Sequence, residues 1–568
     1  MVRPTSPWHR LPDIDTAMRM TWAITRLALL VAALATAAHA AEPTPAIRLN
    51  SVGYLPGHQK KTSIAANCKQ FALRRVSDGE RVFEGEVSGP TTNTDTQEQL
   101  YIADFSQFNE SGEFQLEASG AGMSAKFRIG TNVYNEPFYL VMRGMYLWRC
   151  GTAVTATYHG QTFHHDACHQ DDAWLDLVAG RHVKMNATGG WHDAGDYNKY
   201  VINASVTVGC MFRAWEDFPA IHRIRLDIPE SGGPIPDFLA EIKWETDWLL
   251  RMQAGDGSVY HKISTMKFGP FIMPEKETAP RFFVPWASAA TADFVAMMSA
   301  ASRYFRPYDA VYADRCLAAA KKSYEFLKGH PGNHNADMMG VSTGGYSTSD
   351  GDDRLWAAAE LWEAAGDPEI LRDAEERIRS IQGRVDRVWD WGNVSNLGLF
   401  TYVLSRRSGR EEALINQVRA SIISVADAIV RTAVHHGYAR PLGNSYSWGC
   451  NGAVARQVFN LQIANRLSPK REYAETSLDA LNHLFGRNCF GRSFVTGLGF
   501  HPPMNPHDRR SGADNIVDPW PGYLVGGPNP RAKDWHDIQA DYRTNEIAIN
   551  WNSALIYALA AFVETSRH

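Results

Sequence analysis

Two acidic groups in the sequence have residue types and spacing that suit acid–base chemistry. Asp193 and Asp196 lie in the polar, glycine-rich segment 189–200. Neighbouring carboxyls perturb each other's protonation, which leaves one ionised as a base that can hold and deprotonate a water. Near the C-terminus, Glu546 lies beside the apolar residues 547–549, where desolvation raises the pKa of a carboxyl and keeps it protonated as an acid. On composition alone, a capping pair or a calcium loop explains the aspartates equally well, and a helix start explains Glu546.

Two cysteines and two histidines form a second candidate set: Cys150, Cys168, His169 and His192. Two thiolates and two imidazoles suit tetrahedral zinc, and with four protein ligands the ion is structural, not catalytic. The spacing differs from that of a zinc finger. From the residues alone, free cysteines and a surface cluster of His165 and His169 are therefore the alternative.

A third polar segment, 346–353, offers the hard oxygen ligands that calcium prefers. It lacks the glutamate that closes an EF-hand loop. A solvated helix start is the alternative, since aspartate is common at N-caps and first turns.

The composition bounds the class of protein. The 568 residues are enough for two or more domains, and 44% hydrophobic with 21% charged residues exclude wholesale disorder. A net charge of -5 gives no electrostatic reason to bind nucleic acid or an anionic membrane. Seven scattered cysteines, an odd number, do not make a disulfide framework. We expect a monomer with a neutral substrate.

Only residues 27–40 are apolar enough to concern a membrane. They are too few for a spanning helix, but they follow Arg26 and end in Ala38-His39-Ala40, as a secretory signal does. We expect residues 1–40 to be a signal peptide with an N-terminal extension, and the mature protein to be secreted or periplasmic without further membrane contact.

The elements that must position these residues change in period along the chain. Short alternating runs with turn signals between residues 45 and 131 predict a small β-sandwich. From 137 to 565 the apolar period is helical, as at Leu355, Ala358, Leu361 and Trp362. The sequence Gly366-Asp367-Pro368 predicts a helix end followed by an N-cap and an N1 proline. The predicted fold class is multidomain: a β-sandwich, then an all-α domain, with a packed interface between them.

Three segments together resemble the signature regions of glycoside hydrolase family 9, in the family's usual order: Trp191-His-Asp-Ala-Gly-Asp-Tyr197, Asn505-Pro-His-Asp-Arg-Arg-Ser511 and Asn545-Glu-Ile-Ala-Ile-Asn-Trp551. The resemblance implies an (α/α)6 barrel over residues 137–565. The β module at 45–131 resembles the immunoglobulin-like domain found in one branch of that family. The implied activity is inverting cleavage of β-1,4-glucosidic bonds in cellulose, amorphous β-glucan or cellodextrins.

The resemblance also implies roles for single residues. Asp196 is similar to the family's general base, Asp193 to the second aspartate that holds the same water, and Glu546 to the general acid. His507 and Arg509 match the His-x-Arg that hydrogen-bonds the sugar next to the cleaved bond. Inversion needs acid and base carboxyls ~6.5 to 9.5 Å apart, which leaves room for the water.

Both metal candidates also resemble sites of the family. Cys150, Cys168, His169 and His192 resemble the zinc site of the branch with the immunoglobulin-like domain. The acidic segment resembles a calcium loop that a later aspartate closes. We therefore expect structural zinc and structural calcium, the calcium held by Thr348, Asp350, Asp352, Asp353 and Asp390.

Aromatic residues in polar loops are the candidates for stacking on sugar rings, since Trp and Tyr combine flat apolar faces with polar edges. They are Trp389, Trp391, Tyr446, Trp448 and Tyr542.

Three functions are compatible with this sequence. The first is a secreted inverting β-1,4-glucanase. The alternative is an exo-acting hydrolase of short β-linked oligosaccharides, of the cellodextrinase, cellobiosidase or glucosaminidase type. Loops 271–282 and 522–535 decide between them, because either could block one end of a cleft. A silent carbohydrate-binding or structural protein is the third, and the joint presence of the two aspartates and Glu546 argues against it.

Overall fold

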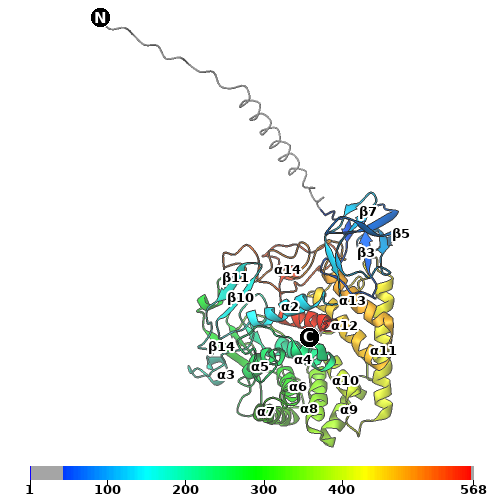
Figure 1. Ribbon diagram of the computed structural model, residues 1–568. Coiled ribbons are helices and arrows are strands. Elements are labelled where there is room, and N and C mark those ends of the chain that lie inside the picture. Colours follow the sequence, from blue (N-terminus) through cyan, green and yellow to red (C-terminus); the bar gives the residue numbers. More distant parts are fainter. Residues whose placement is uncertain (2–42, 565–568) are drawn as a thin grey trace. The chain divides into compact units, whose positions relative to one another are not determined.

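The computed structural model describes Met1 and residues 43–564 (Figure 1). The predicted signal peptide at residues 1–40 lies, Met1 apart, outside the described residues. From Thr44 onward the described chain forms one compact unit.

A nine-stranded sheet forms the N-terminal part, which we call the β-domain. Its strand order is β1-β3-β6-β5-β4-β7-β9-β2, with β8 paired to β7. The long strand β5 pairs with β4 through Arg81–Glu86 and with β6 through Val87–Asn93, with a bulge between Ser88 and Thr91. The sheet thus folds over on itself around an aromatic core. The strands are β1 (Ile47–Arg48), β2 (Gly53–Tyr54), β3 (Lys61–Ile64), β4 (Gln70–Arg75), β5 (Arg81–Asn93), β6 (Glu98–Asp104), β7 (Gly112–Ala118), β8 (Gly122–Met123) and β9 (Phe127–Ile129).

The rest of the described chain is mainly helical, and we call it the helical domain. They are α2 (Asn135–Leu147), α3 (Asp176–Ala179), α4 (Val201–Asp217), α5 (Asp237–Leu249), α6 (Ser288–Tyr304), α7 (Ala310–Gly329), α8 (Gly351–Ala365), α9 (Pro368–Ser380), α10 (Ser395–Leu404), α11 (Glu412–Val434), α12 (Cys450–Leu467), α13 (Arg471–Leu484), α14 (Tyr542–Asn545) and α15 (Ile549–Ala560). Two short 3-10 helices, η1 (Pro219–Arg223) and η2 (Pro274–Lys276), lie in loops.

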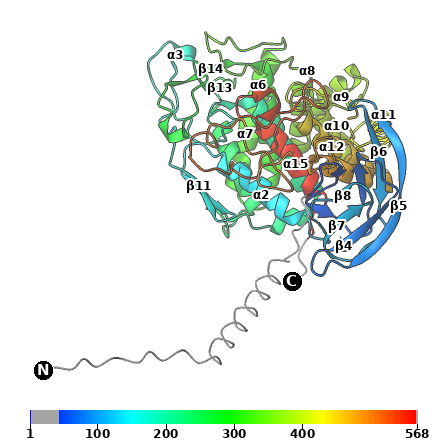
Figure 2. The same ribbon diagram turned by 90° about the horizontal axis from the view of Figure 1, so that it is seen from above.

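The long helices of the described chain form two rings. The inner ring is α4, α6, α8, α10, α12 and α15, which are buried on nearly all sides, and α15 (red in Figure 2) closes it by packing on α4 and α12. Asn396 of α10 donates to Asn460 of α12 at 3.2 Å, which joins those two helices. Helices α2, α5, α7, α9, α11 and α13 cover the inner ring from outside. This double ring is the (α/α)6 arrangement, so the predicted fold class is confirmed.

Local signals in the sequence explain several helices. Gly366 ends α8 with a φ of 73°, and Asp367 caps α9 by accepting a hydrogen bond from the backbone amide of Glu369 at 2.8 Å. Pro368 follows as the first residue of α9. Helix α11 is long and apolar enough to cross a membrane by length and composition. Its fully buried residues, which include Val418 and Ile422, recur every three or four positions, as in an amphipathic helix that packs on a protein core.

Two small sheets lie in the loops of the helical domain. One is the hairpin of β10 (Val154–Tyr158) and β11 (Gln161–His165). The other has the order β12 (Lys199–Tyr200), β13 (Tyr260–Thr265) and β14 (Arg281–Trp286). The second sheet begins directly after the segment that carries Asp193 and Asp196, so it anchors that segment.

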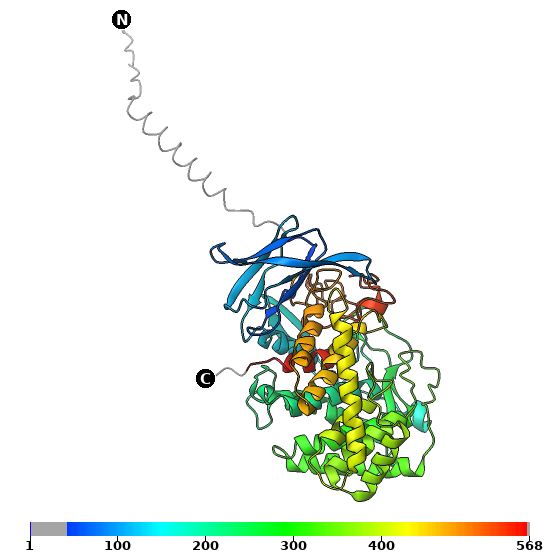
Figure 3. The ribbon, with the colours of Figure 1, turned by 90° about the vertical axis from the view of Figure 1, so that its right-hand side faces the viewer.

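The two domains pack against each other (Figure 3). Asn50 donates to Asn482 at 3.0 Å, and the backbone amide of Ser51 donates to the carbonyl of Phe485 at 3.1 Å. The hydroxyl of Ser63 donates to the carbonyl of Gly437 at 2.9 Å. The expected packed interface is therefore present, and it is largely polar where these bonds form.

Candidate active site

Asp193 is buried between two neutral donors. The side-chain amide of Asn203, on α4, donates to its Oδ1 at 2.7 Å, and the hydroxyl of Tyr346 donates to its Oδ2 at 2.8 Å. Burial and the nearby charge of Asp196 raise the pKa of Asp193 to about 8. Both oxygens of Asp193 thus have fixed partners, which sets the orientation of the carboxyl.

Asp196 is buried beside Asp193 and is held by the residues that lead into α4. Its Oδ2 accepts hydrogen bonds from the backbone and the side-chain amide of Asn198 and, at 3.3 Å, from the hydroxyl of Tyr200. Asn198 in turn accepts a hydrogen bond from the backbone amide of Thr265 at 3.0 Å. Oδ2 therefore carries all of these bonds, and strand β13 fixes their geometry.

Glu546 lies partly buried next to the two aspartates. Burial, followed by the charges of Asp196 and Asp193, raises the pKa of Glu546 well above its usual value. The charge of Arg509 and a hydrogen bond from the backbone amide of Gly195 oppose part of this shift. Glu546 therefore stays protonated over a wider pH range than an ordinary glutamic acid.

Gly195 joins the three segments that carry these residues. Its amide faces Glu546, and its carbonyl accepts hydrogen bonds from the backbone of Arg509 at 3.1 Å and from the guanidinium of Arg509 at 2.7 Å. A side chain at position 195 would overlap the carbonyl oxygen of His507, so only glycine fits. The structure thus brings the predicted base, second aspartate and acid together around one glycine.

His507 and Arg509 lie beside the acidic site, but most of their side-chain hydrogen bonds go to backbone carbonyls. His507 Nδ1 lies 2.7 Å from the carbonyl of Gln539. Arg509 Nε donates to the carbonyl of Gly269 at 3.1 Å, and its guanidinium lies over the rings of Phe268 and Phe271. Arg509 therefore joins loop 271–282 to the acidic site, a role that the sequence did not reveal.

The predicted sugar platforms fall into two groups. Trp448 and Tyr542 are 51% and 44% exposed, with ring centroids 5.6 Å apart, and Tyr542 lies 6.0 Å from the ring of His507. They form an aromatic surface that continues from the acidic site. Tyr446 is half-buried and donates its hydroxyl to Asp95 of the β-domain, so it is not a free platform.

The prediction for Trp389 is wrong. Its side chain is 2% exposed and packs edge-on against Phe400 and Phe459 in the core, where no sugar can reach it. Two positions along, Trp391 lies on the outer side of the same turn, with its ring 5.0 Å from that of Tyr346. The turn at Asp390 sends the two tryptophans to opposite sides.

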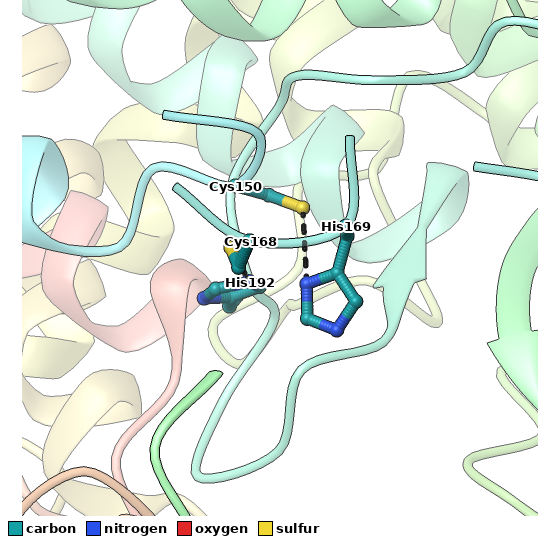
Figure 4. Close-up of side chains that lie close together, drawn as sticks. All are labelled: Cys150, Cys168, His169 and His192. Atoms are coloured by element: carbon teal, nitrogen blue, oxygen red, sulfur yellow. Dashed lines mark hydrogen bonds between the residues drawn. The ribbon is translucent and has the colours of Figure 1, made fainter. Parts of the chain in front are cut away.

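The four predicted zinc ligands converge (Figure 4). Their ligand atoms all lie within 4.8 Å of one another, with Cys150 Sγ 3.7 Å from His169 Nδ1 and Cys168 Sγ 3.6 Å from His192 Nε2. The second nitrogen of His169 lies 3.3 Å from a carboxylate oxygen of Glu277. Two thiols and two imidazoles at this spacing fit tetrahedral zinc, and the outer carboxylate on a ligating histidine is typical of such sites.

The five predicted calcium ligands do not converge. In the described part of the chain they belong to no group of three or more metal-ligating side chains. Four of them have partners of their own: Thr348 with the carbonyl of Gly392, Asp350 with Arg354, Asp352 with the amide of Val394, and Asp390 with Arg456 and Asn550. Asp353 is buried near Asp293, and neither of its carboxylate oxygens has a hydrogen-bond partner among the described residues. Calcium binding stays a prediction.

The two loops expected to close the cleft differ in burial. Residues 522–527 are fully buried, and β-bridges join Leu524 to Val495 and Val525 to Ile547. This part of loop 522–535 belongs to the core and does not project as a barrier. Loop 271–282 lies against the site, with the ring of Phe271 5.2 Å from that of His507.

Sequence reasoning missed Tyr346 as part of the site, because it lies at the start of the acidic segment. Its φ of 46° is in the left-handed region, which bulky residues rarely adopt. This backbone geometry turns the phenol toward Asp193.

Comparison with known proteins gives likenesses to two family models, to a cellulase and to two solved structures. The sequence model of the glycosyl hydrolase family 9 matches residues 134–559, and the sequence model of the cellulase N-terminal ig-like domain matches residues 42–123. The chain is 57% identical to Endoglucanase D of Acetivibrio thermocellus over 521 residues, 91% of this chain and 83% of that protein. The crystal structure of a metagenome-derived glycoside hydrolase family 9 endoglucanase aligns with 91% of this chain and with 99% of its own chain, at a TM-score of 0.86 and 33% identity. The crystal structure of a Zn-binding triple mutant of GH family 9 endoglucanase J30 aligns with 90% of this chain and with 100% of its own chain, at a TM-score of 0.84 and 32% identity.

Proposed function

The chain belongs to glycosyl hydrolase family 9, and from this premise we propose that it is an endo-acting, inverting β-1,4-glucanase of cellulose and related β-glucans. The observation that carries the proposal is the meeting of Asp193, Asp196 and the partly buried Glu546 around Gly195. The 57% identity to an Endoglucanase D supports β-glucan as the substrate and endo as the mode of action.

In the proposed reaction Glu546 is the general acid. Its raised pKa keeps the carboxyl protonated, so it can give its proton to the glycosidic oxygen while the bond to the anomeric carbon breaks. Asp196 is the general base: it takes a proton from a water that attacks the anomeric carbon from the opposite face. The proton lost by Glu546 and the proton gained by Asp196 balance, and the anomeric configuration inverts.

The neighbours of the two aspartates determine where that water can lie. Tyr346 and Asn203 occupy one lone pair on each oxygen of Asp193, and Asn198 and Tyr200 donate only to Oδ2 of Asp196. Oδ1 of Asp196 is the oxygen left to accept from water. We propose that Asp193 orients the same water as its second carboxyl.

Trp448 and Tyr542 are the proposed stacking surface for the glucan chain. Their exposed rings lead toward His507 beside Glu546, and sugars stack on aromatic faces. Within loop 271–282, Phe271 lies beside His507 on the same site.

Zinc is the metal that we propose at Cys150, Cys168, His169 and His192. When bound, it would cross-link three loops, and His192 directly precedes Asp193 in the sequence. Its role would be to hold the loop of the two aspartates and not to take part in bond cleavage. Calcium on the acidic segment is less favoured, since Asp390 already pairs with Arg456.

Export and domain boundaries complete the proposal. A signal peptide within residues 1–40 would send the protein to the periplasm or the medium, and N-terminal sequencing of the exported protein tests this. The β-domain would occupy residues 45–131 and the catalytic barrel residues 137–565.

Product analysis of cellohexaose and carboxymethylcellulose tests the function, with Glu546→Gln as the comparison. NMR should detect the α-anomer first, and the signal should vanish in the variant. A spread of product lengths with a rapid fall in viscosity indicates endo action. Release of one short product from the chain end would instead support the exo-acting alternative. Absence of cleavage with both substrates would contradict β-1,4-glucanase activity.

A further inference from the structure

A hairpin of the β-domain contacts the loop that joins α11 to α12. The amide of Gly437 donates to the side-chain carbonyl of Asn93, at the end of β5, at 3.1 Å. A side chain at position 437 would come within 2.6 Å of Leu100 on β6. The loop therefore approaches the sheet as closely as a glycine allows.

One carboxylate of this hairpin holds both ends of the loop. Asp95 accepts a hydrogen bond from the hydroxyl of Tyr446, and the same oxygen lies 3.1 Å from Nε2 of His436. The side chains of Asp95 and His436 are both largely buried. Burial works against its charge, yet the hydrogen bonds from His436 and Tyr446 lower the pKa of Asp95 to about 2. Asp95 is thus a buried anion whose ligands lie on a segment more than 300 residues away in the chain.

The loop leads directly to an exposed aromatic residue. Trp448 follows Tyr446 by two positions and lies beside Tyr542. On its other side, the ring of Tyr446 packs under the guanidinium of Arg440 at 4.2 Å, and Arg440 donates to the carbonyl of Ser445 at 2.8 Å. Tyr446 is therefore fixed from two sides, and its place sets that of Trp448.

We propose that Asp95 of the β-domain is a positioning residue for the substrate, because it holds the loop that presents Trp448 to the glucan chain. The inference rests on the proposed function, in which Trp448 is a stacking surface. Buried hydrogen bonds to a charged group are among the stronger ones, and removal of one partner leaves the others unpaired. Without Asp95 the loop loses the side-chain ties to the β-domain at His436 and Tyr446 and keeps the bond of Tyr438 to Glu98, which lies farther from Trp448 in the sequence.

Steady-state kinetics on cellohexaose tests the proposal with three variants of the full-length protein. Asp95→Ala removes the carboxylate, and Tyr446→Phe removes only the hydroxyl that it binds. Both should raise KM about threefold to tenfold, the scale of a lost aromatic contact, with kcat changed less than about twofold. Asn50→Ala is the matched control, because it breaks a buried bond between the same domains at Asn482, away from the loop. It should lower Tm and leave KM unchanged.

The combination with Trp448→Ala separates the possible failures. If Asp95 acts through Trp448, Asp95→Ala should add nothing to the KM of Trp448→Ala. A lower Tm with unchanged KM in both Asp95→Ala and Tyr446→Phe would overturn the proposal and leave Asp95 a purely structural residue. An unchanged KM in Trp448→Ala would overturn it for another reason, the absence of a sugar platform there. Hydrolysis by the unaltered protein tests the proposed function on its own.

Discussion

The hydroxyl of Tyr346 donates a 2.8 Å hydrogen bond to Oδ2 of Asp193 across 153 positions of the chain. Tyr346 precedes α8, whereas Asp193 lies before α4, so the bond joins two different parts of the inner ring. It also fixes the carboxyl that neighbours the proposed base. The orientation of Asp193 therefore depends on a residue that is outside all three signature segments.

Tyr346→Phe should lower kcat on cellohexaose about tenfold while KM changes little, since the lost hydrogen bond to a buried carboxyl is worth ~1.5 kcal/mol. Tyr324→Phe is the matched control. It removes a 2.7 Å bond from a tyrosine to Asp373 on the outside of the barrel and should leave kcat unchanged. Equal kinetic effects in the two variants would contradict the role of Tyr346.

Glu546→Gln should lower kcat by about a hundredfold to ten thousandfold, as expected when a general acid is lost. Because the pKa of Glu546 is raised, the unaltered enzyme should lose activity only as pH rises above the ordinary glutamate range. A kcat-against-pH profile on cellohexaose measures this alkaline limb. A limb at the ordinary glutamate pKa would argue against Glu546 as the acid.

Arg509→Gln should move the alkaline limb to higher pH. The positive charge of Arg509 favours the ionised form of Glu546, so its removal raises the pKa further. The shift is measured in the same kcat profile, with Tm as a check on folding. A limb that moves to lower pH, or that stays in place in a folded variant, would contradict this electrostatic link.

Glu277→Gln should weaken zinc binding about tenfold to a hundredfold, as is typical when the outer partner of a ligating histidine is lost. Glu277 faces the nitrogen of His169 that points away from the thiols. Zinc content and competition with a chelator measure the effect. Glu376→Gln, at an exposed position on α9, is the control and should keep the zinc affinity of the unaltered protein. Zinc-free protein with an intact fold would contradict the site itself.

Gly195→Ala should destabilise the fold by about 1–3 kcal/mol, the cost of overpacking a core, and should also reduce kcat. The added methyl overlaps the carbonyl of His507 and must push the segments of Asp196 and Glu546 apart. Denaturant unfolding measures the first effect. Gly255→Ala, which meets no neighbouring atom, is the control and should be neutral. Unaltered stability and kcat in Gly195→Ala would show that the segments are not tightly joined there.

Much of the fold follows from periodicity and local signals. Leu355, Ala358, Leu361 and Trp362 are all buried on α8, and Gly366 ends that helix. The spacing of apolar residues sets which face is buried, and glycine and proline set where a helix can start or stop. These features depend only on near neighbours in the chain.

The parts that sequence reasoning could not reach depend on distant neighbours. Trp389 and Trp391 flank the same aspartate in one polar segment. Trp389 nevertheless packs in the core, whereas Trp391 faces Tyr346. The carboxylate of Asp390 pairs with Arg456 on α12, and no local sequence pattern predicts this contact. The residues alone leave free cysteines as the alternative to zinc at Cys150, Cys168, His169 and His192, and the resemblance to the family favours the set that the structure brings together.

The direct bonds around Gly195 bear on how such enzymes can be recombined. The segments of the proposed acid and base touch each other directly, while residues encoded between them, Thr265 and Tyr346, orient the two aspartates. A chimaera that takes residues from α5 to α13 from a relative, and keeps both ends of the chain, would retain the contacts of Gly195 and would need Thr265 and Tyr346 to be kept as well for the original geometry of the two aspartates. A crossover inside 505–546 would instead combine mismatched halves of the catalytic centre.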